Sequence, residues 1–203
     1  MNKRILCRID FQNDFVHPDG SLTISDVELI ERHQKFANNL FKNSFDAIID
    51  SYDTHFEETY HNTIEARTYG KHCIYGTWGW QQAAPFKECL DVTPIFKSTT
   101  NIWNEKENNQ VLQNSFNNTD VYLCGVLSDV CVKEAFDGFL KHGANVIILE
   151  DLCKGLNQEI TDILQNGTYH ALAEYGRIKS ITSQQFFRQE LLSKKIEHNM
   201  VIR

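Results

Sequence analysis

The sequence predicts a doubly wound, three-layer α/β fold with a mostly parallel sheet of six strands. Short apolar runs alternate along the chain with longer segments of helical periodicity, the order expected of repeated strand–helix units. Several runs are apolar at consecutive positions, as at 146–149, which is typical of strands buried on both faces of a parallel sheet. A length of 203 residues, against about 150 residues for a typical domain, predicts one domain spanning residues 1–203.

The first half of the chain contains three predicted strands and one clear helix. The strands cover residues 5–10, 47–52 and 93–97. Ser25 and Glu28 have the spacing of a capping box, so we expect Ser25 to cap a helix that runs to about residue 42.

The second half continues the alternation. Strands are predicted at 121–126, 146–149 and 178–181. The first is followed by a helix over about 129–142 that Gly143 ends, and the second by a helix over about 158–174 that Gly176 ends. Ser183 is expected to cap a last helix.

Composition excludes several classes of protein. Twenty Lys and Arg against 27 Asp and Glu give a net charge of −7, which argues against a nucleic-acid partner. The longest apolar runs are about five residues, too short for a membrane span, and the N-terminus lacks a signal-peptide pattern. The six cysteines are spread along a chain without a secretory signal, so we expect free thiols in a cytoplasmic protein. No Cys-x-x-Cys pair is present, which excludes a zinc ribbon or a thioredoxin motif.

Reactive side chains follow four of the predicted strands. Asp10, Asp53 with His55, Lys97 and Cys131 each stand at or just beyond a strand's carboxyl end. Open parallel sheets bind their ligands at that edge. No Gly-x-Gly-x-x-Gly follows the first strand and there is no P-loop, so a dinucleotide site is not expected. The shared edge instead predicts a site with an acid, a base, a thiol and metal ligands.

Cys131 falls in the first turn of a predicted helix. Free N–H groups and the helix dipole stabilise a thiolate there, and the same N–H groups can hold a developing oxyanion. Asp10 is a candidate acceptor for the thiol proton, and Lys97 can pair with either charge. The residues alone leave open a buried inert cysteine, an aspartate that caps a turn and a lysine on the surface.

Asp53 and His55 are two residues apart, so in extended backbone their side chains point the same way. Asp-x-His is a plausible two-ligand edge of a metal site, which needs further groups. His61, Glu65 and His72 follow in a long polar loop over about 56–79 and are the candidates.

Four blocks of this sequence, in order, resemble the isochorismatase-like cysteine hydrolases, and within them the nicotinamidases. The resemblance covers nearly the whole chain. The blocks are residues 10–15 with 18–22, residues 53–55 with 60–61, 65 and 72–79, Lys97, and residues 125–132.

The resemblance implies a catalytic triad of Asp10, Lys97 and Cys131. Cys131 would form a thioester with nicotinamide, releasing ammonia and then nicotinate for NAD salvage. The backbone N–H groups of Leu127 and Cys131 would form the oxyanion hole, next to a cis peptide bond between Val126 and Leu127. Family members are often oligomers, so a homo-oligomer is expected.

The resemblance also implies one divalent metal ion that anchors the substrate. Asp53, His55 and His72 match three constant ligands, and Glu65 is the preferred fourth, with His61 as its alternative. Zinc is the expected ion, with iron or manganese as alternatives.

The substrate pocket is the least conventional part of the resemblance. Thr54, Phe56 and Ser98 stand where the family usually has Trp, Pro and Gly. Phe15, Tyr69 and Trp103 are the candidate walls against a planar ring, and simple packing in the core is the alternative for each.

Three other functions stay open, and these departures motivate the first of them. The first is a related hydrolase of another small amide, a carbamoyl compound, ureidoacrylate or isochorismate. The second is a binding protein without catalysis. The third is a redox sensor that uses the Cys131 thiol.

Overall fold

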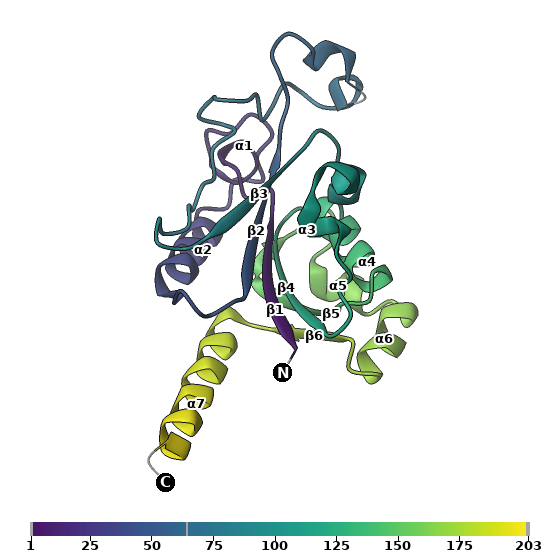
Figure 1. Cartoon of the computed structure of the whole chain (residues 1–203). Coiled ribbons are helices and arrows are strands. Elements are labelled where there is room, and N and C mark those ends of the chain that lie inside the picture. Colours follow the sequence, from purple (N-terminus) through teal and green to yellow (C-terminus); the bar gives the residue numbers. More distant parts are fainter. Residues whose placement is uncertain (1, 64, 202–203) are drawn as a thin grey trace.

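The chain folds around a parallel sheet with helices on both faces (Figure 1). The computed structural model describes residues 2–63 and 65–201, with side chains as far as residue 193. Within these residues one six-stranded sheet has the order β3-β2-β1-β4-β5-β6, and every adjacent pair is parallel. The predicted fold class is confirmed. The strands are β1 (Lys3–Ile9), β2 (Ala47–Asp53), β3 (Val92–Lys97), β4 (Thr119–Val126), β5 (Asn145–Lys154) and β6 (Ile178–Ile181).

The helices form the two outer layers. Figure 1 shows α2 (Val27–Asn39) and α7 (Ser183–Val201) on one side of the sheet, where Phe36 packs on Phe186. The other side carries α3 (Gln110–Gln113), α4 (Cys131–Lys141), α5 (Ile160–Leu164) and α6 (Gly167–Glu174). Shorter turns connect these layers: α1 (Asn13–Val16), η1 (Tyr60–Asn62), η2 (Glu65–Arg67) and η3 (Ile102–Asn108). Among the described helices none is long and apolar enough to cross a membrane.

The core lies along the central strands. Val121, Leu123 and Cys124 on β4 are each at most 1% exposed, because helices cover both faces of this strand. Full burial of one such apolar side chain contributes about 1.5–3 kcal/mol. The consecutive apolar positions in the sequence reflect this burial on both sides.

The strand order reverses between β1 and β4, which places a crevice at their carboxyl ends. Asp10 directly follows β1, and Leu127 directly follows β4. The two strands approach closely here, because Gly125 has φ +119° and a Cβ at this position would collide with the carbonyl oxygen of Ile9. Backbone packing therefore brings the two loops that carry candidate residues to one point.

The boundaries of α2 differ from the prediction. Asp26, not Ser25, is the cap, since its carboxylate accepts a hydrogen bond from the N–H of Leu29 at 2.8 Å. Ser25 instead takes a left-handed conformation with φ +53°. The helix ends at Asn39, three residues earlier than expected.

The helix predicted over 158–174 is two helices. Asn166 interrupts it, and its side chain accepts the N–H of Thr168 at 3.1 Å to begin α6. Ser183 is the first residue of α7 rather than its cap. Thr182 takes that role, because its hydroxyl accepts the N–H of Gln185 at 3.1 Å.

Candidate active site

Asp10 is fixed by the neighbouring strand. It is fully buried and has φ +47°, so its side chain turns away from the line of β1. The hydroxyl of Ser51 donates to Asp10 Oδ1 at 2.7 Å and accepts the N–H of Asp10 at 3.1 Å. Ser51 thereby holds Oδ1 of the carboxylate through a hydrogen bond, and the other oxygen, Oδ2, faces the interior of the site.

Lys97 ends β3 and points its ammonium group into the same space. Its Nζ lies 2.6 Å from Asp10 Oδ2, 2.9 Å from the carbonyl oxygen of Thr99 and 3.8 Å from Cys131 Sγ. These three neighbours match the three hydrogens of an ammonium group. Burial disfavours the charge, but Asp10 and Cys131 raise the pKa of Lys97 well above its usual value.

Cys131 is the first residue of α4, two positions later than the predicted helix start. The turn before it is closed by the carbonyl oxygen of Leu127, which accepts the N–H groups of Val130 at 3.0 Å and Val132 at 3.1 Å. The peptide bond between Val126 and Leu127 is cis, as the resemblance implied. The thiol therefore lies at the N-terminus of an eleven-residue helix, where the helix dipole favours a negative charge.

We call Asp10, Lys97 and Cys131 the thiol cluster. Burial raises the pKa of both Asp10 and Cys131, and the charge of Lys97 opposes this in each. A hydrogen bond with Asp10 also raises the pKa of Cys131. One cation can compensate one anion, so a single proton shared by the thiol and the carboxylate would leave the charges of the cluster balanced. Moving that proton from sulfur to oxygen leaves the cluster's net charge unchanged.

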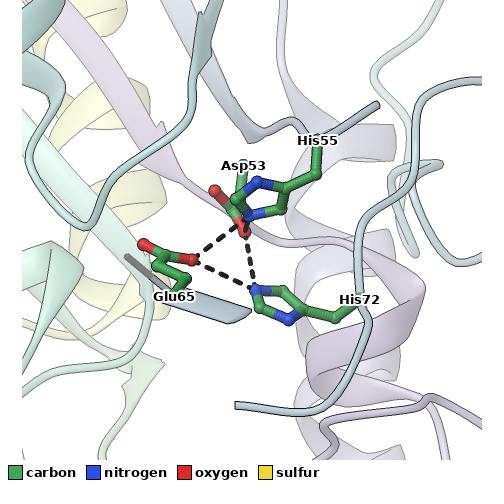
Figure 2. A group of neighbouring side chains, drawn as sticks. All are labelled: Asp53, His55, Glu65 and His72. Carbon is green, nitrogen blue, oxygen red and sulfur yellow. Dashed lines mark hydrogen bonds and ion pairs between the residues drawn. The ribbon is translucent and has the colours of Figure 1, made fainter. Parts of the chain in front are cut away.

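A second group, the ligand cluster, comprises Asp53, His55, Glu65 and His72 (Figure 2). One possible ligand atom from each residue lies within 4.8 Å of the others. The distances between facing atoms are 3.1 Å for each histidine Nε2 to Asp53 Oδ2, and 3.2 and 3.3 Å for His55 and His72 Nε2 to Glu65 Oε2. Two imidazole nitrogens and two carboxylate oxygens thus converge on one point.

The donor set fits a divalent cation. His72 Nδ1 lies 2.7 Å from the carbonyl oxygen of Gly70, which fixes the tautomer and turns Nε2 toward the cluster. Although burial opposes it, hydrogen bonds to Asp53 and Glu65 raise the pKa of His55 to about 9 and of His72 to about 10. With both imidazoles protonated, their two positive charges would balance the two carboxylates. One divalent ion can replace these two protons. Mixed nitrogen and oxygen ligation suits zinc, iron(II) or manganese.

The two candidates for a fourth ligand lie in different places. Glu65 opens η2 and belongs to the ligand cluster. His61, in η1, is exposed and outside the cluster. The geometry therefore favours Glu65.

A cavity of about 380 Å³ joins the two clusters. Cys131, Lys97 and Leu127 line it together with Asp53 and His72. Its further lining includes Phe15, Tyr69 and Glu65. A volume of this size is typical of small-molecule sites.

Trp103 does not line this cavity, which corrects its prediction as a pocket wall. Its ring stacks on His142 with centroids 4.3 Å apart, and its Nε1 donates to the carbonyl oxygen of Ala135 at 3.3 Å. It is packed under α4, because η3 carries it toward the helix core instead of the strand ends.

Sequence reasoning missed the residues that hold the candidates in place. Ser51 orients Asp10, and Gln12 grips the backbone of Asp53, with its side chain bonded to both the N–H and the carbonyl oxygen at 2.8 Å. Both are fully buried polar side chains. Polar residues inside a strand of the central sheet, such as Asp50 and Ser51 in β2, are a signal that could have indicated buried hydrogen-bond partners.

Solved structures of related proteins share this fold. Pyrazinamidase of Pyrococcus horikoshii in complex with zinc is 26% identical, with a TM-score of 0.66 over 89% of this chain and 99% of that one. PnC1 from L. infantum in complex with nicotinate is 22% identical, with a TM-score of 0.64 over 90% and 94% of the two chains. The second likeness shows the fold alone.

Sequence comparisons point the same way. An uncharacterized isochorismatase family protein, PncA, from Bacillus subtilis (strain 168) is 27% identical over 174 residues, which are 78% of this chain and 90% of that protein. Residues 4–174 match the family model of the isochorismatase domain. With that match over most of its length, the chain belongs to the isochorismatase family.

Proposed function

We propose that this protein is a metal-dependent amidase of the nicotinamidase type, which hydrolyses nicotinamide to nicotinate and ammonia. One observation carries the proposal: members of both clusters line a single cavity. They are Cys131 and Lys97 of the thiol cluster and Asp53, Glu65 and His72 of the ligand cluster. The first supplies a nucleophile with a proton acceptor, and the second can anchor a substrate that carries a ring nitrogen. The reaction would return nicotinamide to pyridine nucleotide synthesis.

Acylation begins with the proton that Asp10 and Cys131 share. Asp10 takes the thiol proton as Cys131 Sγ attacks the amide carbonyl carbon, and Lys97 balances the negative charge throughout. The N–H groups of Leu127 and Cys131 donate to the oxygen of the tetrahedral intermediate. Asp10 then passes its proton to the amide nitrogen, the C–N bond breaks, and ammonia leaves a thioester on Cys131.

Hydrolysis of the thioester uses the same residues in reverse. Asp10 takes a proton from water as the water oxygen attacks the acyl carbon. The C–S bond breaks and the thiolate of Cys131 takes that proton from Asp10. The carboxylic acid leaves the site and gives its own remaining proton to the solvent.

Asp53, His55, Glu65 and His72 would hold the metal ion. When bound, the ion would act as a Lewis acid that binds the ring nitrogen of the substrate and so orients the substrate. Phe15 and Tyr69 line the same cavity and can pack against a planar ring. The zinc in the Pyrococcus pyrazinamidase supports zinc as the ion here.

The charges on the cavity favour a neutral substrate. The described lining residues include one lysine, Lys97, which is paired with Asp10, and the acidic Asp53 and Glu65. A divalent ion would neutralise the two carboxylates and leave little excess positive charge for an anion. This favours nicotinamide over isochorismate or a carbamoyl acid, which carry carboxylates.

Ammonia release by the purified, zinc-loaded protein tests the proposal. Nicotinamide, isochorismate and a carbamoyl amino acid are compared at equal concentration, with pyruvate release as the readout for isochorismate. We expect turnover of nicotinamide at least tenfold above the two anionic compounds. Preferential turnover of either anion, or no turnover of nicotinamide, would reject the proposal in favour of the related hydrolases.

A further inference from the structure

Asp14 makes an unusual pair of contacts beside the cavity. It belongs to the α1 turn and is 8% exposed. Its Oδ1 accepts the N–H of Ser21 at 3.0 Å, and its Oδ2 accepts the N–H of Cys73 at 2.7 Å. Ser21 lines the cavity, whereas Cys73 directly follows the candidate metal ligand His72. One carboxylate therefore holds two segments that are 52 residues apart in sequence.

The backbone of Cys73 connects this carboxylate to both histidines of the ligand cluster. Cys73 follows His72, and its carbonyl oxygen accepts the N–H of His55 at 3.0 Å. Cys73 also has φ +46°, a conformation that a non-glycine residue adopts only when its surroundings hold it there. The bond from its N–H to Asp14 is one such restraint at the point where the ligand segment turns.

The surroundings are shaped to admit the Asp14 carboxylate. The N–H of Asp14 donates to the carbonyl oxygen of Gly79 at 3.0 Å. A Cβ at Gly79 would overlap the carboxylate, and a Cβ at Gly20 would overlap the backbone of residues 13–14. The N–H of Leu22 donates to the carbonyl oxygen of Asp14 at 3.1 Å, which adds a second link to the cavity wall. Neither Gly20 nor Gly79, which lie on either side of Asp14, has space for even one methyl group.

We propose that Asp14 is a positioning residue that holds His72 and the cavity wall at Ser21 in fixed relation through one carboxylate. The metal part of this proposal rests on the proposed function, since it takes the ligand cluster to bind an ion. Asparagine at this position has one acceptor oxygen and one donor group. It would leave one of the two N–H groups facing another donor, while keeping the size of the side chain.

Two measurements on Asp14→Asn test the proposal. Equilibrium dialysis against zinc should give a dissociation constant about 10- to 100-fold above wild type, the usual loss when a partner outside the ligand shell is removed. Amide hydrogen exchange of the metal-free protein should quicken in both the 20–24 and the 72–75 segments. Gly79→Ala displaces the same carboxylate by a different route, and it should produce both effects.

Asp129→Asn is the matched control. The Asp129 carboxylate also accepts backbone N–H groups, from Leu156 at 2.9 Å and Asn157 at 2.8 Å, but touches no ligand segment. Its variant should quicken exchange near 155–158 and leave the zinc dissociation constant within twofold of wild type.

Zinc affinity of Asp14→Asn and Gly79→Ala within twofold of wild type would overturn the proposal, as would exchange that quickens in one segment only. Wild-type protein that binds no zinc would contradict the proposed function instead. The exchange measurement would still decide whether Asp14 joins the two segments.

Discussion

The thiol cluster and the ligand cluster are both buried at the same cavity, yet they differ in how their charges are balanced. In the thiol cluster, Lys97 lies 2.6 Å from Asp10, so the cation that the site needs is part of the chain. In the ligand cluster, Asp53 and Glu65 face two imidazoles, and Lys97 Nζ is 3.9 Å from the other oxygen of Asp53. This more distant lysine is shared with Asp10, so full balance of the two carboxylates needs protonated imidazoles or a bound cation.

This difference separates two kinds of functional site. A buried charge is expensive unless it is paired, so each cluster needs a positive charge. The thiol cluster obtains it from β3 and can exchange one proton internally. In the proposed function, the ligand cluster would obtain it from a bound metal ion. The first is therefore expected to depend on each side chain, and the second on the supply of metal.

Removal of the internal cation should have the largest effect on stability. Lys97→Met leaves Asp10 buried without its partner, a loss that costs about 3–5 kcal/mol in buried ion pairs. Urea denaturation should show this loss, and ammonia release from nicotinamide should disappear. The double variant Lys97→Met/Asp10→Asn should recover part of the stability, because no buried charge remains. A single variant as stable as wild type would show that Lys97 does not balance Asp10.

Removal of the external cation should have a smaller effect on stability. An ion at 100 times its dissociation constant stabilises the folded state by about 2.7 kcal/mol. Dialysis against a chelator should therefore lower the unfolding temperature and stop ammonia release, and both should return with zinc. Full activity in protein shown by elemental analysis to hold no metal would remove the distinction between the clusters.

Some of this site could be predicted from the sequence and some could not. Asp10, Lys97 and Cys131 stand at strand ends, and the topology of a parallel sheet brings such positions together. Ser51 and the carbonyl of Thr99, which complete the contacts of Asp10 and Lys97, depend on side-chain directions that no local pattern encodes.

Errors in the prediction have local causes. Helical periodicity continues through 158–174, but Asn166 caps a new helix within it. Trp103 is an aromatic side chain predicted as a pocket wall, whereas η3 turns it against His142. In each case a local contact decided the outcome: the side-chain cap at Asn166 divides the helix, and the stacking on His142 places Trp103. Sequence periodicity does not show either contact.

The fourth ligand provides a sharper test of the external cluster. Glu65→Gln should weaken zinc binding at least about tenfold, the scale for losing even an outer partner. His61→Ala should leave zinc binding within twofold of wild type, since His61 is exposed and outside the cluster. Isothermal titration calorimetry of the two variants measures both. The opposite order of affinities would make His61 the ligand.

A third buried histidine should show the smallest effect. His33 stacks on Phe11 with centroids 3.6 Å apart, and its Nε2 lies 2.9 Å from the carbonyl oxygen of Leu152. Burial lowers the pKa of His33 well below 6.5, and the charges of Arg8 and Arg32 lower it further. Burial alone therefore does not set the charge of an imidazole, because His55 and His72 face carboxylates and have raised pKa values.

The sign of the pH effect follows from this lowered pKa. Below pH 6.5 the unfolded chain binds a proton at His33 that the folded protein does not, so stability falls as the pH falls. One proton accounts for at most about 1.4 kcal/mol per pH unit. His33→Gln should reduce the loss of stability between pH 7.5 and 5.5 in urea titrations, whereas His170→Gln, at an exposed site, should not. Equal slopes for wild type and His33→Gln would contradict this assignment.

Ammonia release from nicotinamide by zinc-loaded Cys131→Ala tests the central claim most directly. Cys89→Ala, which removes an exposed thiol away from the cavity, is the control. If Cys131 is the nucleophile, its variant should lose activity by roughly 10⁴-fold or more, keep its zinc and unfold at a similar temperature, while Cys89→Ala matches wild type. A Cys131→Ala protein that still releases ammonia at a rate near that of wild type would contradict the account.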